Sequence, residues 1–338
     1  MAEYINIRGQ NIEVVASDPA NPTIGQIWYN STSNTLKGLG VSTAGSWATG
    51  GALNNLRTQT NLMIAGTQTA AIVTSLAGSP TTSKTELYNG LTWTNSPATY
   101  PTTARFLNLM GTQTATITGG GVNEPPGVVS AVSASFNGTS WTANPSLNTA
   151  RNTANGYGVS NTANTLAGGD NGGGLNSTET WNNVSWTTVP GTLSTGRPAG
   201  CNAIGSSKDA FLFVGGGPSP TQSVESWNGT TWTTIPGTPV TNLPAIRSSF
   251  GGAGNPTAAV VFGGNPPVYS GNTLNWNGTT WTANPNSMNV GSPNRAHVGG
   301  CGTQAAALAA GGENPVAGLA TEEYTGPGAP LTVTITAS

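Results

Sequence analysis

The residue whose type and spacing could do chemistry most clearly in this chain is arginine. Six of the seven arginines hold the same place in a recurring unit: Arg57, Arg105, Arg151, Arg197, Arg247 and Arg295. A ring of guanidinium groups could bind anions such as sulfated or sialylated glycans. It could instead tie the repeats together by donating hydrogen bonds to backbone carbonyls or to a nearby glutamate. One arginine in every unit favours the structural role.

A glutamate often stands two residues before an aromatic in the same unit and is the expected partner of the arginine. It is present as Glu86, Glu179, Glu225 and Glu322. Ala134 and Leu274 replace it in two units, so strict pairing of arginine with glutamate is not expected everywhere.

Other residues that perform catalysis are scarce. The chain has one histidine, His297, and three aspartates at unrelated places, whereas acid–base and metal chemistry usually need several such groups. We therefore predict no enzyme, no catalytic residue, no metal site and no cofactor, and we expect His297 to be a structural residue of an inner strand. Cys201 and Cys301 fall on the inner strands of two repeats that are separated by a third. They are expected to be free, buried thiols.

A short aromatic motif organises the repeat. In each copy an aromatic residue and a tryptophan are five positions apart, with Asn-Gly or a similar pair between them; the copies start at Tyr88, Phe136, Trp181, Trp227 and Trp276. Asn-Gly predicts a hairpin with a two-residue type I′ turn. With that turn Trp232 would be the diagonal neighbour of Trp227, and both rings would lie on one face of the hairpin. We interpret these rings as core between repeats rather than as sugar-stacking surfaces.

The tryptophans that close the motif are regularly spaced. They are separated by 46, 48, 45, 46 and 49 residues and stand at Trp47, Trp93, Trp141, Trp186, Trp232 and Trp281. A period in the forties is typical of a propeller or a solenoid, and four strands fit into one period. Within each period a small-residue strand often ends in Gly-Thr-Gln, and the next strand ends in a glycine pair such as Gly168-Gly169.

An arginine, a glycine pair at a strand end, an aromatic and a spaced tryptophan resemble the kelch repeat. The resemblance covers residues 46–326 and implies an all-β fold, a six-bladed β-propeller of four-stranded blades. Small inner strands such as 305–310 suit the crowded centre of such a fold. The sixth blade lacks its own closing tryptophan, so the Trp47 strand is expected to complete it. The tail 327–338, which alternates like a strand over 331–335, is the competing candidate.

Antiparallel strand order places the loops on two faces. The Gly-Thr-Gln and Asn-Gly turns share one face and are uniform, whereas the loops between second and third strands and between repeats share the other and vary widely. Binding residues tend to lie on loops that a rigid scaffold carries. The candidate ligand contacts on this variable-loop face are Tyr100, Glu124, Asp170 and Tyr269.

Residues 1–45 lie outside the repeat and are predicted to form a small β module. The string Gly25-Gln26-Ile27-Trp28-Tyr29-Asn30, followed by Leu36-Lys37, resembles the N-terminal module of many bacteriophage fibre and virion proteins. That resemblance implies a segment that docks to the particle and partners that are other virion proteins.

Composition narrows the function further. Only 22 of 338 residues are charged and the net charge is −2, which argues against nucleic acid as a partner. No apolar run is long enough for membrane insertion, and no signal peptide is visible, so synthesis in a host cytoplasm is expected. The chain is therefore expected to be a phage exterior fibre or tail protein that contacts a host glycan or receptor. The alternatives are a head or neck decoration that binds only virion proteins, and a bacterial carbohydrate-binding kelch protein.

Overall fold

The computed structural model describes residues 12–41, 44–57, 62–77, 82–217, 221–236, 242–265, 270–290, 295–313, 318–328 and 330–335. In these ranges every regular element is a β-strand, which confirms the all-β class. The chain divides into a small unit, residues 1–45 with 326–338, and a large unit, residues 46–325.

Four-stranded antiparallel sheets fill the large unit, and the described residues form six of them. Sheet one contains β5 (Ile64–Thr67), β6 (Ala70–Ala77), β7 (Thr82–Tyr88) and β8 (Trp93–Asn95). Sheet two contains β10 (Asn108–Thr112), β11 (Ala115–Gly119), β14 (Ser133–Phe136) and β15 (Trp141–Asn144). Sheet three contains β16 (Asn155–Ser160), β17 (Ala163–Ala167), β18 (Thr178–Trp181) and β19 (Trp186–Val189).

The other three sheets repeat this order. Sheet four contains β20 (Cys201–Ser207), β21 (Ala210–Gly215), β22 (Val224–Trp227) and β23 (Trp232–Thr234). Sheet five contains β24 (Gly251–Asn255), β25 (Ala258–Phe262), β26 (Thr273–Trp276) and β27 (Trp281–Ala283). Sheet six contains β28 (Gly299–Gly302), β29 (Ala306–Ala310), β30 (Thr321–Thr325) and β4 (Ser46–Thr49).

The fourth strand of sheet six thus comes from the start of the large unit. Trp47 in β4 is paired with Tyr324 in β30, and the tail takes no part in this sheet. A small extra sheet belongs to the loops around sheet two and contains β9 (Ala104–Arg105), β12 (Val122–Asn123) and β13 (Val128–Val129).

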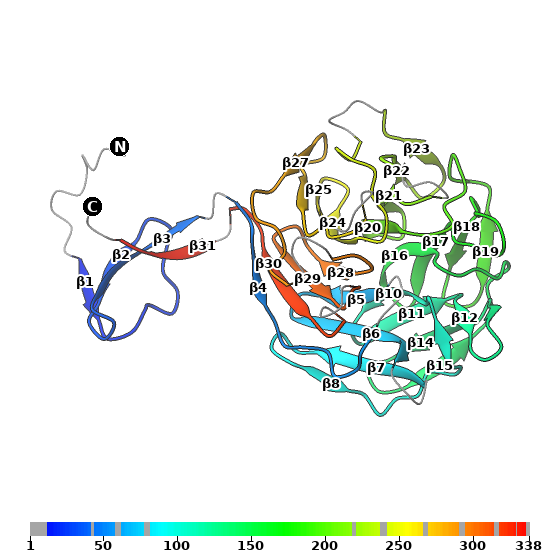
Figure 1. Cartoon of the computed structure of the whole chain (residues 1–338), viewed down its shortest axis with the longest axis horizontal. Coiled ribbons are helices and arrows are strands. Elements are labelled where there is room, and N and C mark those ends of the chain that lie inside the picture. The colour runs from blue at the N-terminus through cyan, green and yellow to red at the C-terminus, as the bar shows by residue number, and fades with distance from the viewer. Residues whose placement is uncertain are drawn as a thin grey trace. The chain divides into compact units, whose positions relative to one another are not determined.

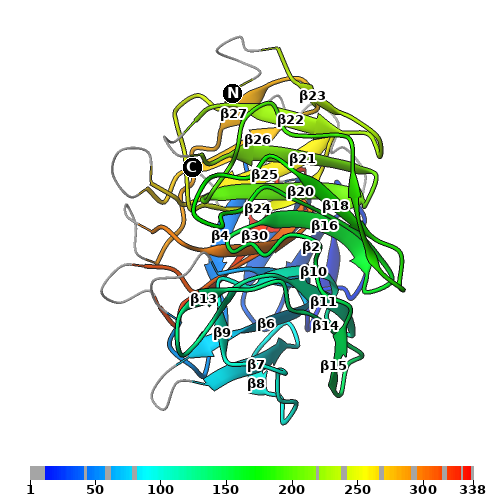
Figure 2. The same ribbon diagram turned by 90° about the vertical axis from the view of Figure 1, so that its right-hand side faces the viewer.

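The first strands of the six sheets contact one another in sequence: β5 with β10, β10 with β16, β16 with β20, β20 with β24, β24 with β28, and β28 with β5. Figure 1 shows these strands innermost, with the sheets arranged around them in a β-propeller-like fold, and Figure 2 shows the same sheets from the side. Small residues make this approach possible. A Cβ atom on Gly300 would lie 2.4 Å from the backbone nitrogen of Gly252 in the neighbouring sheet, so a larger residue would force the strands apart.

The aromatic hairpins differ from the predicted type in their turn. Trp227 and Trp232 are directly paired, so four residues rather than two form the turn. The Asn228 side chain accepts hydrogen bonds from the backbone N–H groups of Thr230 and Thr231 at 3.0 and 2.8 Å. Only Gly229 has a positive φ there, because the asparagine acts through its side chain rather than through its own backbone. The type I′ prediction was therefore wrong.

The small unit is one mixed sheet of β1 (Glu13–Val15), β2 (Ile27–Asn30), β3 (Thr35–Val41) and β31 (Pro330–Thr334). β2 and β3 form an antiparallel hairpin, and β1 is parallel to β2. The sequence predicted the tail 327–338 as a segment separate from residues 1–45. In the structure, its strand β31 pairs with β3 along Lys37 to Val41. The module therefore includes both ends of the described chain.

Asp18 fixes one face of the small unit. Its carboxylate accepts hydrogen bonds from the Trp28 indole at 3.0 Å and the Asn30 amide at 2.7 Å, and it forms an ion pair with Lys37 at 2.7 Å. The Lys37 contact, followed by those of Asn30 and Trp28, lowers the pKa of Asp18 to about 2. Trp28 is fully buried beneath this network.

Acid is expected to weaken the small unit between about pH 4 and pH 2. Because the folded pKa of Asp18 lies below the unfolded value of about 3.9, its contribution is present above pH 4 and is lost as the pH falls to about 2. The indole N–H signal of Trp28 in an NMR acid titration would report this loss. Asp18→Asn should remove the transition in that window, and an unchanged titration in the variant would contradict the assignment.

Candidate functional site

Five of the six repeat arginines are buried inside the large unit, and Arg105 is the exception. Arg151 and Glu179 are both fully buried, with Nη2 of the arginine 2.7 Å from Oε1 of the glutamate. Nη1 of Arg151 also donates to the carbonyl of Gly168 at 2.9 Å. The same buried ion pair forms between Arg57 and Glu86, Arg197 and Glu225, and Arg295 and Glu322.

The glycine pair explains why the arginine fits at that place. Gly168 and Gly169 both have positive φ, at 66° and 93°, a conformation that turns the chain sharply after β17. This turn presents the Gly168 carbonyl to Arg151. The N–H of Gly169 then donates to the carbonyl of Arg197, which begins the next repeat, at 2.9 Å. The pairs Gly215-Gly216 and Gly263-Gly264 make the same two bonds, so these glycine pairs link their own arginine to the following repeat.

The glutamate also holds the loop that carries the arginine. Oε2 of Glu179 accepts the backbone N–H of Asn148 at 2.8 Å, and Oε1 accepts that of Thr149 at 3.1 Å. Glu86, Glu225 and Glu322 accept backbone N–H groups from the equivalent loops, those of Asn54, Ser194 and Asn289. The carboxylate is thus saturated with donors and is not available to a ligand.

Burial and pairing set the electrostatics of these sites. Burial lowers the pKa of Arg57 and Arg151, and the adjacent carboxylates of Glu86 and Glu179 oppose this shift. Each pair is close to neutral, because one carboxylate compensates one guanidinium. These groups form a scaffold, in agreement with the structural role that the sequence favoured.

Sheets two and five differ, as the absence of their glutamates indicated. Arg105 forms an ion pair with Glu124 of the neighbouring loop at 2.7 Å, and its side chain is 40% exposed. Arg247 is buried beside Leu274, and the described residues offer it no carboxylate.

The four candidate ligand contacts do not come together as one site. Tyr100 is 3% exposed, its hydroxyl is 2.8 Å from that of Thr118 and its ring contacts Trp141, so it is a core residue and the hypothesis for it was wrong. Glu124 forms the ion pair with Arg105. Asp170 accepts the N–H of Gly172 at 2.9 Å in a different loop. Tyr269 lies outside the described residues.

The paired aromatics pack between neighbouring sheets. Ring centroids of the five hairpin pairs, such as Trp227 with Trp232, are 5.0 to 5.5 Å apart. Tyr324 and Trp47, from opposite ends of the large unit, make a sixth pair at 5.0 Å. The indole N–H of Trp232 donates to Thr178 of sheet three at 2.9 Å, and four other tryptophans make the same bond to the preceding sheet: Trp47, Trp93, Trp141 and Trp186.

Trp281 lacks this bond because the preceding sheet has Val224 at the position of the hydroxyl. Thr273→Val should therefore destabilise the protein by about 1–3 kcal/mol, since it leaves the buried N–H of Trp47 unpaired. Val224→Thr gives Trp281 a partner and should leave the free energy of unfolding within about 1 kcal/mol of the parent. Urea unfolding measures both, and equal losses in the two variants would rule out a role for the hydroxyl.

The glutamine of the Gly-Thr-Gln turn joins neighbouring sheets, a role that was not predicted from the sequence. The Gln113 side chain of sheet two donates to the carbonyls of Ala71 and Tyr88 in sheet one, at 2.9 and 2.6 Å. Gln68 and Gln304 bind the second and third strands of their neighbours in the same way. The recurrence of glutamine after Gly-Thr was the signal that could have indicated it.

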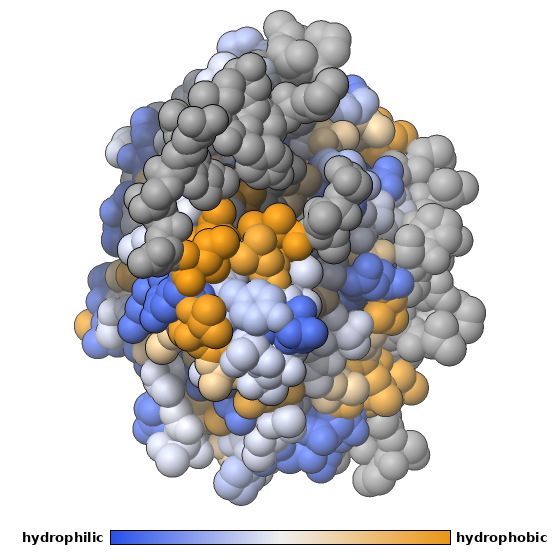
Figure 3. Space-filling view, turned by 90° about the vertical axis from the view of Figure 1, so that its left-hand side faces the viewer, coloured by the Kyte–Doolittle hydropathy of each residue, from blue (hydrophilic) through white to orange (hydrophobic). Residues whose placement is uncertain are grey.

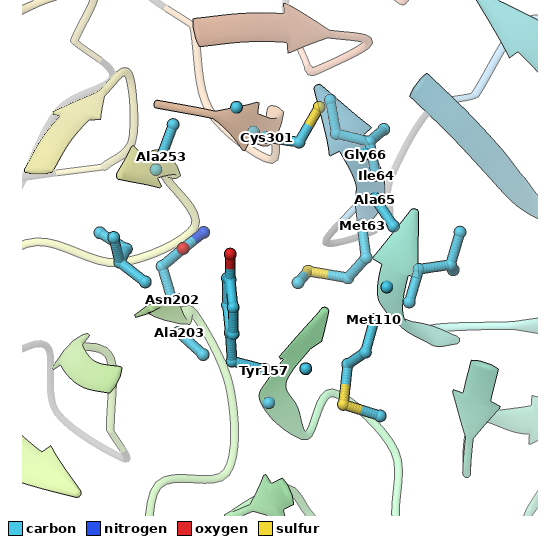
Figure 4. A pocket seen from close by; sticks show the side chains of 18 of the residues that line it. Met63, Ile64, Ala65, Gly66, Met110, Tyr157, Asn202, Ala203, Ala253 and Cys301 are labelled. Carbon is cyan, nitrogen blue, oxygen red and sulfur yellow. The ribbon is translucent and has the colours of Figure 1, made fainter. Parts of the chain in front are cut away.

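A central cavity of about 60 Å³ lies between the first strands. Figure 4 shows Tyr157, Met63, Asn202 and Cys301 around it. Such a volume suits a few water molecules and is far below the roughly 300–1,000 Å³ of a small-molecule site. The cavity is therefore too small for a typical small-molecule ligand.

The single histidine and the two cysteines have structural surroundings. His297 precedes β28 instead of lying on that inner strand, and its Nδ1 is 2.9 Å from Glu313. Burial lowers the pKa of His297, and Glu313 opposes the shift. Cys201 and Cys301 are free and buried, as expected, and burial raises the pKa of the Cys201 thiol to about 12. That thiol stays protonated and unreactive at neutral pH.

Among the described residues there is no group of three or more His, Cys, Asp or Glu side chains that could hold a metal ion. The same residues include no helix long and apolar enough to cross a membrane. No protein-family model matches this chain, and no curated protein matches it.

Proposed function

We propose that residues 46–325 form a closed six-bladed propeller of kelch type in a non-enzymatic exterior protein of a bacteriophage virion. In this proposal the protein is a fibre or tail component, and its variable-loop face contacts a host surface glycan or protein. The contacts of the first strands, which run from β5 through β28 and return to β5, support six blades in a ring. The pairing of β4 with β30 supports closure by the Trp47 strand.

One observation carries the functional proposal: most of the recurring charged side chains form buried ion pairs with one another inside the large unit. Four of the six repeat arginines form buried ion pairs with their glutamates. In such a chain the arginines and glutamates that recur in the repeats make the scaffold rigid, and the loops that vary between repeats are the place for recognition. This is what a binding or spacer protein requires, and it differs from an enzyme that concentrates titratable groups in one pocket.

The small unit supports a second contact surface, for a virion protein. Val14 is 67% exposed and Ile12 and Ile24 are also exposed. Val14 is paired with Tyr29, and Tyr29 with Leu36, so these side chains share one face of the sheet. Figure 3 shows apolar residues gathered on the face of the molecule that it presents. Exposed apolar residues on a small sheet are typical of a protein contact.

Binding of the full chain to purified virion proteins and to intact host cells tests the proposal. The full chain is needed because β3 and β31 share a sheet, so division after residue 45 would break the small unit. Val14→Lys should reduce binding to virion proteins alone. Val128→Asp, in the exposed loop of sheet two, should reduce binding to cells alone.

The outcomes separate the alternatives. Binding of virion proteins through both surfaces, with no binding to cells, would identify a head or neck decoration. Binding to bacterial carbohydrate without any virion partner would identify the carbohydrate-binding kelch protein. Failure to bind any virion component would overturn the phage assignment.

A further inference from the structure

Arg247 is buried without a carboxylate, unlike the other five repeat arginines. Arg247 is only 3% exposed. Its Nη1 donates hydrogen bonds to the carbonyls of Gly263 at 2.8 Å and Asn272 at 3.1 Å. Nε has no hydrogen-bond partner, which is also true of Nε in the paired Arg197. The difference lies at Nη2, which bonds Ser223 and Glu225 in Arg197 but has no bond to the described residues in Arg247. Half of the guanidinium is therefore held by the scaffold, and the other half has no acceptor.

The place of the missing carboxylate is known from the register. Leu274 is paired with Val261 in sheet five as Glu179 is paired with Leu166 in sheet three. A leucine side chain ends one bond before the carboxylate oxygens of a glutamate and supplies no acceptor. Sheet five has thus lost the negative charge but has kept the arginine and the carbonyl that orients it.

The loop that carries Arg247 in sheet five also differs from the equivalent loop of sheet three. In sheet three the residue three positions before the arginine, Asn148, donates its N–H to Glu179. In sheet five this position is Pro244, which has no N–H. One of the two loop amides that bind Glu179 therefore has no counterpart in sheet five, and the positive charge of Arg247 remains to be compensated.

A buried cation without a counter-charge is costly. Burial is the cause that lowers the pKa of Arg247, to about 10, and no nearby carboxylate opposes it. The guanidinium is still protonated at neutral pH, because the pH lies well below that value. The site consequently favours an anion that comes from outside the chain.

We propose that Arg247 is an anion site at the loop face and that it takes a single carboxylate group. One carboxylate balances one guanidinium, and the glutamates of the paired sheets contact a terminal nitrogen of the guanidinium. In sheet five Nη2 is the terminal nitrogen without an acceptor among the described residues. Four other sheets of this protein hold a carboxylate against the equivalent arginine. The carboxylate belongs either to a free small acid or to an acidic sugar.

Calorimetric titration of the full chain with sodium acetate and with sodium glucuronate, at constant ionic strength maintained with sodium chloride, tests this site. Saturable binding of either probe is the expected result. Equal affinity for both probes would identify the free carboxylate group as sufficient, whereas binding of glucuronate alone would identify the sugar-borne source. Absence of saturable binding of both probes would overturn the proposal.

Two substitutions with a matched control locate the binding. Leu274→Glu supplies an internal carboxylate, so the affinity for the probe should fall by about tenfold or more. Leu274→Met has a similar size without a charge or a strong acceptor and should retain binding. Arg247→Met should abolish binding. Undiminished binding in Leu274→Glu, or equal loss in Leu274→Glu and Leu274→Met, would show that the anion does not lie against Arg247.

Discussion

Glu179→Leu is expected to lower the free energy of unfolding by about 3–5 kcal/mol. The substitution leaves Arg151 buried with no counter-charge and leaves the backbone N–H groups of Asn148 and Thr149 without their acceptor. Each unpaired buried group adds its own desolvation cost. Urea unfolding followed by tryptophan fluorescence measures the loss.

The same substitution at Glu124 is the matched control. Glu124 also pairs with a repeat arginine, but its side chain and that of Arg105 are 24% and 40% exposed. Water screens such a pair, so Glu124→Leu should cost about 1 kcal/mol or less. A double variant, Arg151→Met with Glu179→Leu, should recover much of the stability lost in the single variant. Equal losses at Glu124 and Glu179 would contradict the dominance of burial.

Trp47→Ala is expected to destabilise the protein by about 3–5 kcal/mol, although Trp47 stands at the very start of the large unit. The ring packs against Phe262 at 4.8 Å and Tyr324 at 5.0 Å, and its indole N–H donates to Thr273. Alanine would leave a cavity between sheets five and six and would unpair that contact. Thermal and urea unfolding of the full chain provide the comparison.

Trp93→Ala is the reference for this prediction, because Trp93 has the same position in sheet one but lies on a strand that is continuous with its own hairpin. Similar losses in the two variants would show that β4 is as integral to sheet six as β8 is to sheet one. A loss below about 1 kcal/mol for Trp47→Ala alone would show that β4 is dispensable.

Much of the large unit could be predicted from local regularity. The tryptophan period predicted repeats of four strands, and the recurrence of arginine and glutamate in one repeat indicated that the two side chains could pair. These features are short-range or strictly periodic, so they appear directly in a single sequence. The Arg151–Glu179 pair is an example, because both residues recur at fixed places in four repeats.

Features that depend on contacts between distant segments could not be predicted in this way. Tyr100 stands in a variable loop, and only the packing of that loop shows that its ring contacts Trp141 and its hydroxyl reaches Thr118. The pairing of β31 with β3 joins segments from the two ends of the chain, and an alternating strand carries no signal of its partner. The two-residue turn predicted at Asn228 was wrong because Asn-Gly also occurs in the four-residue turn that the structure shows.

The pairing of β3 with β31 also determines how the protein bears tension. Val41 is opposite Pro330 in that pair, so the chain leaves the small sheet and returns to it at neighbouring points, with residues 46–325 between them. A pull between the two ends of the chain is carried by the small sheet first, and the large unit bears no load until β3 and β31 separate. The small sheet therefore separates before the large unit is loaded. The force that separates β3 from β31 is the force that must be exceeded before any of the six larger sheets begins to unfold.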